Sequence, residues 1–189
     1  MARSTIYKKW EKEVKRYFRN EIMIGTSRET HLFWMKEITV YRGNTSLYSI
    51  KETDRCFWFF THCLYPISLF LQMFFCRKYE IFEGDELVGA SQNTHTKPAR
   101  TFTIHSDEYC LFVHKSNQFS LTRNGKQIAL YKRASASAYS VDFDQDEPIE
   151  IIDLFCLFID ETFFDDHRTA KIYVFRDPHS EHTLWNPEK

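Results

Sequence analysis

The chain has 189 residues, a formal net charge of −1, 17% aromatic residues and only five glycines. This length fits one domain that buries its own core, and the aromatic content argues against disorder. A near-neutral charge excludes a global attraction to nucleic acid or acidic lipid, so any such attraction must come from a local patch. The five cysteines are odd in number and form no C-x-x-C pair, which predicts buried free thiols.

The first twenty residues have apolar side chains at helical spacing, at Ile6, Trp10, Val14 and Tyr17–Phe18. Six cations lie between them: Lys8, Lys9, Lys12, Lys15, Arg16 and Arg19. We predict an N-terminal amphipathic helix over 1–20, whose basic face either binds a membrane surface or a protein, or is simply exposed to solvent. No signal-peptide core is visible, so we expect a cytoplasmic protein that can associate peripherally with membranes.

Three later segments alternate in polarity around a tight turn, and the turns hold Gly43, Gly84 and Gly125. Each segment has the strand–turn–strand pattern of a β-hairpin. The equal spacing of the glycines indicates either a repeated hairpin unit or chance. Shorter runs with strand composition are FTIH, YCLFVHK, YSVDF and KIYVF. The sequence therefore predicts a mainly antiparallel β fold.

The segment Phe57–Cys76 contains no charged residue and is as long as a membrane span. His62, Pro66 and Gln72 lie near its middle, where each would be costly in hydrocarbon. We therefore predict two buried strands and no transmembrane span, with an integral membrane protein as the alternative.

The stretch DQDEPIEIIDLFCLFIDETFF begins with carboxylates and Pro148, which suit the start of a helix. Between Asp153 and Asp160 every residue is apolar, so a helix from about 148 to 163 has no polar face and must be buried. Glu147, Glu150, Asp153 and Asp160 could be acid/base residues, but we expect them to cap the ends of this helix.

The order of these motifs carries a family resemblance. A strand, a glycine turn and a glycine-bearing strand stand in KYEIFEGDELVGAS, and hairpins follow in FTIHSDEYCLFVHKSNQFSLTRNGKQIALYKR. The last motif is the acidic stretch DQDEP that precedes the apolar helix. From about 37 to 164 the chain resembles the tubby C-terminal-like superfamily, which includes tubby-like proteins, plant LURP-one-related proteins and phospholipid scramblases. The resemblance implies a closed β-barrel around a central hydrophobic helix, and a non-enzymatic association with phosphoinositides or other phospholipids.

Further cations could hold a lipid phosphate if they converge on one face of such a barrel. They are Arg77, Lys78, Arg123, Lys126, Lys132 and Arg133, and the alternative is scattered surface charge. Asp165–Asp166–His167 and the pair His179/His182 have metal-ligand atoms, but no spacing fixes a closed site. No nucleophile motif or phosphate-binding loop is present, so we expect no catalytic residue, metal or cofactor.

These observations predict an N-terminal helix (1–20), a barrel domain with a central helix (21–176) and an irregular tail (177–189). The function we expect is a non-enzymatic binding module at an anionic membrane surface, with no nucleic-acid partner. The alternatives are a protein-interaction or regulatory domain with no lipid role and a hydrolase built on a barrel scaffold.

Overall fold

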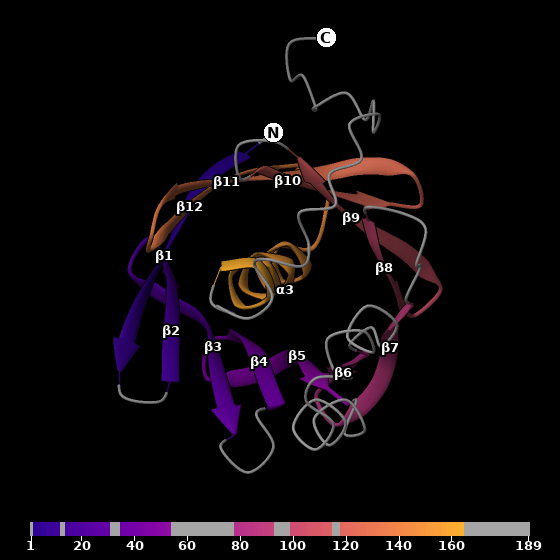
Figure 1. Ribbon diagram of the computed structural model, residues 1–189, viewed down its shortest axis with the longest axis horizontal. Helices are drawn as coiled ribbons and strands as arrows, with labels where there is room; N and C mark the ends of the chain where they lie inside the picture. The colour runs from indigo at the N-terminus through magenta and orange to yellow at the C-terminus, as the bar shows by residue number, and fades with distance from the viewer. Residues whose placement is uncertain are drawn as a thin grey trace, which may run out of the picture.

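The computed structural model describes residues 2–11, 14–30, 35–53, 78–92, 99–114 and 118–164. Twelve strands form a closed antiparallel barrel (Figure 1). The strands are β1 (Ala2–Glu11), β2 (Val14–Arg19), β3 (Ile22–Thr30), β4 (Met35–Arg42), β5 (Thr45–Glu52), β6 (Tyr79–Glu83), β7 (Glu86–Gln92), β8 (Ala99–Ile104), β9 (Asp107–His114), β10 (Gln118–Arg123), β11 (Lys126–Ser135) and β12 (Ala138–Phe143).

The barrel closes where β1 pairs with β12, with Ala2 opposite Phe143 and Tyr7 opposite Ala138. Every other strand pairs with its neighbours in the chain. Closure leaves no strand edge with unpaired backbone groups among these twelve strands. The predicted mainly β fold, a closed antiparallel barrel, is therefore confirmed.

The two ends of the barrel differ. At one end, which we call the turn end, five two-residue turns join β2 to β3, β4 to β5, β6 to β7, β8 to β9 and β10 to β11. Gly43, Gly84 and Gly125 stand in three of these turns with φ of 63°, 57° and 82°, a region that glycine enters without strain. The three predicted hairpins are confirmed. We call the opposite end the exit end, because the C-terminal end of the central helix lies there.

The helix α3 (Ile149–Ile159) begins after Pro148 and runs through the middle of the barrel (Figure 1). It continues into a π-helical turn, η2 (Asp160–Phe164), which ends the described chain. All residues from Ile151 to Ile159 are buried, as the predicted helix over 148–163 requires. Its apolar character therefore has a simple cause: the barrel wall surrounds it on every side.

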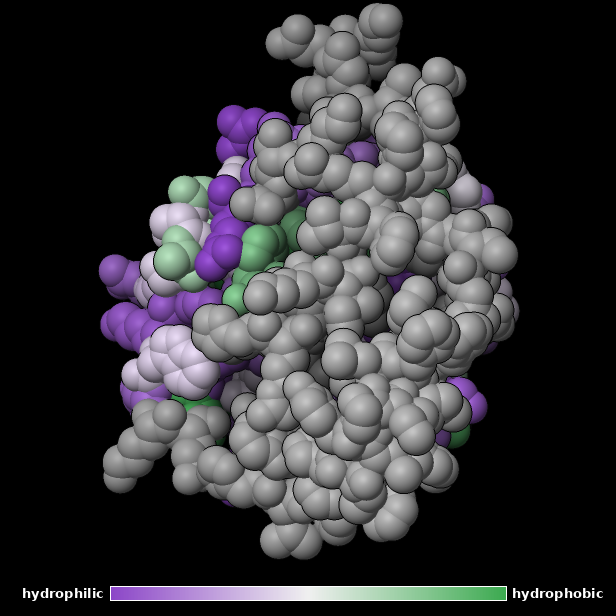
Figure 2. All heavy atoms as spheres, viewed as in Figure 1, coloured by the Kyte–Doolittle hydropathy of each residue, from purple (hydrophilic) through white to green (hydrophobic). Residues whose placement is uncertain are grey.

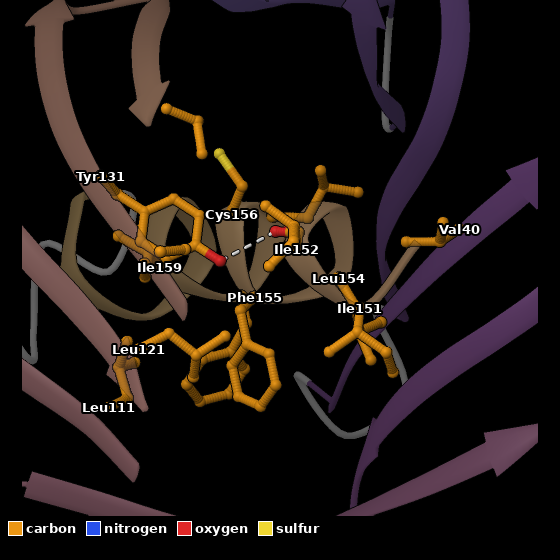
Figure 3. Close-up of a cluster of buried hydrophobic side chains, with 14 of the residues drawn as sticks. Val40, Leu111, Leu121, Tyr131, Ile151, Ile152, Leu154, Phe155, Cys156 and Ile159 are labelled. Atoms are coloured by element: carbon orange, nitrogen blue, oxygen red, sulfur yellow. Dashed lines mark hydrogen bonds between the residues drawn. The ribbon is translucent and has the colours of Figure 1, made fainter. Parts of the chain in front are cut away.

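Side chains of the wall and of the helix interlock around this axis (Figure 3). The ring of Phe155 meets Phe102 edge-on at 5.1 Å between centroids, and Phe158 does the same with Tyr79 at 5.0 Å. Tyr131, which points inward from β11, donates a hydrogen bond of 3.0 Å to the carbonyl of Ile152. Edge-to-face pairs of this kind stabilise by about 0.5–1.5 kcal/mol beyond their buried area.

The predicted N-terminal helix is wrong, because residues 2–11 and 14–19 form the strands β1 and β2. The barrel therefore begins at Ala2 and not at residue 21. The inward row of β2 is Lys15, Tyr17 and Arg19, so two of its three buried side chains are charged. Inward cations hide the alternation of apolar and polar residues by which a half-buried strand is recognised. The helical spacing of Ile6 and Trp10 is a coincidence.

Several predictions fall on residues outside the described ranges. They concern the uncharged segment 57–76, the strand KIYVF, the tail 177–189 and the candidate metal ligands from Asp165 onward. Among the described residues, no helix is long and apolar enough to cross a membrane. Of the five cysteines, Cys156 is buried in the helix and Cys110 is half-buried, and both are free thiols.

Candidate functional site

Three arginines of the wall hold three carboxylates at the start of the helix. Each arginine directly precedes a turn at the turn end, and a β-bulge lies just before it in its hairpin. The pairs are Arg123 Nη1 with Glu147 at 2.9 Å, Arg42 Nε with Glu150 at 2.7 Å, and Arg19 Nη2 with Asp153. The three carboxylates therefore contact three different hairpins. The predicted capping role describes these carboxylates only in part, because their ion pairs with the arginines also tie the helix to the barrel wall.

Asp153 is the most deeply placed of these three carboxylates. Burial raises the pKa of Asp153 to about 7, although the nearby Arg19 guanidinium opposes the shift. The Cys156 thiol lies one turn further along the helix, and burial raises its pKa as well. A low pKa is what makes a thiol reactive, so Cys156 is an inert core residue.

A second group of charges fills the exit end, and we call it the exit-end cluster. It consists of Lys8, Lys15, Tyr17, Lys36, Tyr139, Asp160 and Glu161. Asp160 has no exposed surface, and both of its oxygens accept from Lys8 Nζ at 2.9 Å. The hydroxyl of Tyr17 lies 2.8 Å from the same carboxylate, and Tyr139 also donates to it. Strands from opposite ends of the sequence thus meet on one helix residue.

Glu161 extends the cluster toward β2 and β4. Lys15 Nζ donates to its carboxylate at 2.6 Å, and Lys36 Nζ donates to its backbone carbonyl at 2.9 Å. Burial raises the pKa of Glu161, but the two ammonium groups outweigh it and the net pKa is lowered. Burial also lowers the pKa of Lys15, against the attraction of Glu161. The Lys15 ammonium and the Glu161 carboxylate, 2.6 Å apart, form an ion pair shielded from water.

The two tyrosines do not act as acids here. Burial, followed by the nearby Asp160 and Glu161 charges, raises the pKa of Tyr17, and the pKa of Tyr139 is raised by burial and Asp160. Both hydroxyls keep their protons and serve as donors to the carboxylates. The exit-end cluster can hold the helix end in place, but its acidic and basic groups already bind one another.

The outer surface of the β1–β2 hairpin is different, and we call it the hairpin face. It comprises Tyr7, Lys9, Arg16 and Phe18. Lys9 and Arg16 are exposed and stand directly opposite each other on the two strands. Tyr7 and Phe18 stack beside them at 5.4 Å between ring centroids. On this side of the molecule, hydrophilic and hydrophobic side chains lie next to one another (Figure 2).

Trp10 connects the hairpin face with the exit-end cluster. It follows Lys8 on the inward row of β1 but lies past the rim, where 60% of its surface is exposed. The Lys15 ammonium lies 4.5 Å from the centre of the indole ring, a cation–π contact. The indole therefore covers the buried ion pair on one side and meets solvent on the other.

The structure separates the predicted anion-binding residues. Of the N-terminal six, Lys8, Lys15 and Arg19 turn inward, Lys9 and Arg16 face outward, and Lys12 lies outside the described residues. The later candidates do not converge on one face. Arg123 and Lys126 pair with carboxylates at the turn end, Lys132 and Arg133 lie on β11, Lys78 is exposed before β6, and Arg77 is outside the described ranges.

Sequence reasoning missed the partners of the helix carboxylates. Tyr17, Lys36, Tyr139 and Glu161 were not expected to meet, because Lys15 and Glu161 are 146 residues apart in the chain. One signal was present: an arginine directly precedes the turn in three separate hairpins, at positions 19, 42 and 123. An arginine repeated at the same position of three hairpins indicates that all three bind the same element, and in the structure that element is the start of the helix.

Comparison with protein-family models, with curated proteins and with solved structures finds no match for this chain. The resemblance to the tubby C-terminal-like superfamily therefore stays a prediction from sequence motifs. Within the described residues, no three His, Cys, Asp or Glu side chains are placed to hold a metal ion.

Proposed function

We propose that this protein is a non-enzymatic binding module that associates with anionic phospholipid surfaces through its exit end. The observation that carries the proposal is the hairpin face, where two exposed cations are paired across the strands beside the half-buried Tyr7–Phe18 stack, with Trp10 exposed at the rim nearby. The module uses the outside of the barrel, because its own helix fills the inside.

The cross-strand pair of Lys9 and Arg16 favours an external anion. Like charges placed directly opposite each other destabilise a sheet, so this pair has a reason to attract a counter-charge. Glu11 supplies part of it, 3.0 Å from Arg16. A lipid phosphate could supply the remainder through charge-assisted hydrogen bonds.

The aromatic residues suit the same surface. Tryptophan and tyrosine gather at the boundary between lipid and water, where the ring is apolar and its N–H or O–H is hydrated. Trp10 is exposed at the rim, and the Tyr7–Phe18 stack lies next to the cations. Charge and aromatic surface on one hairpin support a membrane-surface role more than either does alone.

Co-sedimentation with vesicles tests this proposal. We expect the protein to bind phosphatidylcholine vesicles that contain phosphatidylserine, to release them as salt rises, and to ignore pure phosphatidylcholine. Each cation near an anionic surface contributes about 1 kcal/mol, so the double variant Lys9→Gln/Arg16→Gln should bind about 30-fold more weakly. Trp10→Ala should weaken binding without removing its salt dependence.

The matched control is Arg3→Gln/Lys126→Gln, which removes two exposed cations at the turn end. It changes the net charge by the same amount, and its binding should stay within about twofold of the wild type. An equal loss in both double variants would mean that total charge, not the hairpin face, governs binding. A wild-type protein that ignores anionic vesicles at low salt overturns the proposal and favours a protein partner.

A further inference from the structure

The charges of the described chain are divided unequally between the two ends of the barrel. On the turn-end side of the midpoints of the strands and of the helix, the described residues include twelve carboxylates and five Lys or Arg residues, a formal net charge of −7. The half toward the exit end holds seven carboxylates and eleven Lys or Arg residues, a net charge of +4. The charge of the described residues is therefore strongly polarised along the barrel axis, although the chain as a whole is near neutral.

Ion pairing sharpens this polarity at the turn end. Each of its five cations has a carboxylate partner in the same half: Arg3 with Asp142, Arg19 with Asp153, Arg42 with Glu150, Arg123 with Asp107 and Glu147, and Lys126 with Asp144. The exposed carboxylates that are not in these pairs include Glu21, Asp85, Glu86, Glu108 and Asp146. The surface presented by the turn end is therefore acidic.

From this polarity we infer that the protein stands end-on at an anionic surface, with the exit end in contact and the turn end pointing away. The strands are about eight residues long, so a tilted barrel is roughly 20 Å tall. This height exceeds the Debye length of about 8 Å at physiological salt. An upright barrel keeps its acidic end beyond the reach of the surface charge, whereas a barrel lying on its side brings that end into the repulsive region.

This inference rests on the proposed function and deepens it, since it fixes which residues meet the lipid. Its test compares carboxylates at the two ends. Glu11 lies on the β1–β2 hairpin and is exposed, so the Glu11→Gln variant removes a negative charge close to the surface. We expect this variant to bind phosphatidylserine vesicles about fivefold more tightly than the wild type.

The matched variant is Asp85→Asn/Glu86→Gln, which removes two exposed negative charges at the turn end. Asparagine is tolerated in this turn, so the fold should be unchanged. An upright barrel predicts a change in affinity of less than about twofold. A gain equal to or greater than that of Glu11→Gln would mean that the acidic end touches the surface, which overturns the end-on orientation.

Lysine acetylation on vesicles, followed by peptide mass spectrometry, gives an independent readout. End-on binding should protect Lys9 and leave Lys126, which is 71% exposed, as reactive as in solution. Equal protection of both lysines overturns the orientation but leaves membrane association intact. Absence of any binding to phosphatidylserine vesicles overturns the proposed function and this inference together.

Discussion

Gly25 in β3 should be intolerant of even one added methyl group. A Cβ at this position would lie 2.5 Å from Leu157 Cδ2 in the helix and 2.7 Å from the backbone oxygen of Thr39. Carbon atoms in favourable contact are about 3.5–4.0 Å apart, so the Gly25→Ala methyl overlaps the helix side chain by about 1 Å. The Thr39 oxygen belongs to β4, which pairs with β3, so it cannot retreat without opening the barrel.

The size of the effect follows from these two contacts. Overpacking a core costs about 1–3 kcal/mol, and the fixed backbone oxygen places Gly25→Ala at the upper part of that range. For a urea m-value of about 2 kcal/mol/M, a loss of about 3 kcal/mol lowers the unfolding midpoint by about 1.5 M. Urea unfolding followed by circular dichroism measures this shift, and the m-value should not change.

A double-mutant cycle separates the two contacts. Leu157→Ala removes the clashing Cδ2 atom and itself costs about 2–5 kcal/mol. In that background, Gly25→Ala should cost at least about 1 kcal/mol less than in the wild type, and the remainder reports the Thr39 oxygen. The control is Gly43→Asn, since nothing lies within 4 Å of a Cβ there and asparagine tolerates the positive φ. A neutral Gly25→Ala, or an equal cost in both backgrounds, would refute the close approach of helix and wall.

Three other perturbations test the interior. Leu157→Asp should abolish cooperative unfolding, since an unpaired buried charge costs several kcal/mol against a total stability of about 5–15, and a folded variant by circular dichroism would contradict the central helix. Asp160→Asn should cost about 3–5 kcal/mol in urea unfolding, because it leaves the buried Lys8 ammonium without its carboxylate, whereas the exposed pair tested by Asp142→Asn should cost less than about 1. Burial raises the pKa of Asp153 to about 7 in the folded protein, whereas an aspartate in the unfolded chain has a pKa of about 4. The folded protein therefore binds this proton more tightly, and the resulting stabilisation is complete below about pH 4 and is lost as the pH rises toward 7. The stability advantage of the wild type over Asp153→Asn should therefore shrink by a few kcal/mol between pH 4 and pH 7, and a constant difference would show that this carboxyl does not titrate there.

The barrel and its helix can be predicted because the signals for them lie within short stretches of the sequence. A helix that is apolar all round has to be surrounded by other parts of the protein. The hairpins are recognisable from glycine-containing turns such as the one at Gly84. The N-terminal strands are not predictable in this way, because Lys15 and Arg19 occupy positions where an apolar residue marks the buried face. These buried cations are tolerated because Glu161 and Asp153 pair with them, and both carboxylates lie more than 130 residues away in the chain. Local pattern cannot reveal a charge whose partner is so remote.

The buried charges have a physical task that the apolar core cannot perform. An apolar helix in an apolar barrel could be stable at several depths and rotations, since contacts of this kind are non-directional. The carboxylates from Glu147 to Asp160 span about 20 Å along the helix axis, and each meets a cation fixed in the wall. Sliding the helix by one turn would move each of them about 5 Å and leave several buried charges unpaired at once, at a cost of several kcal/mol each. The ion pairs therefore select one depth and one rotation of the helix in the barrel. Because the helix neutralises the inward cations Lys8 and Lys15, the proposed binding of an outside anion is assigned to the outward-facing Lys9 and Arg16.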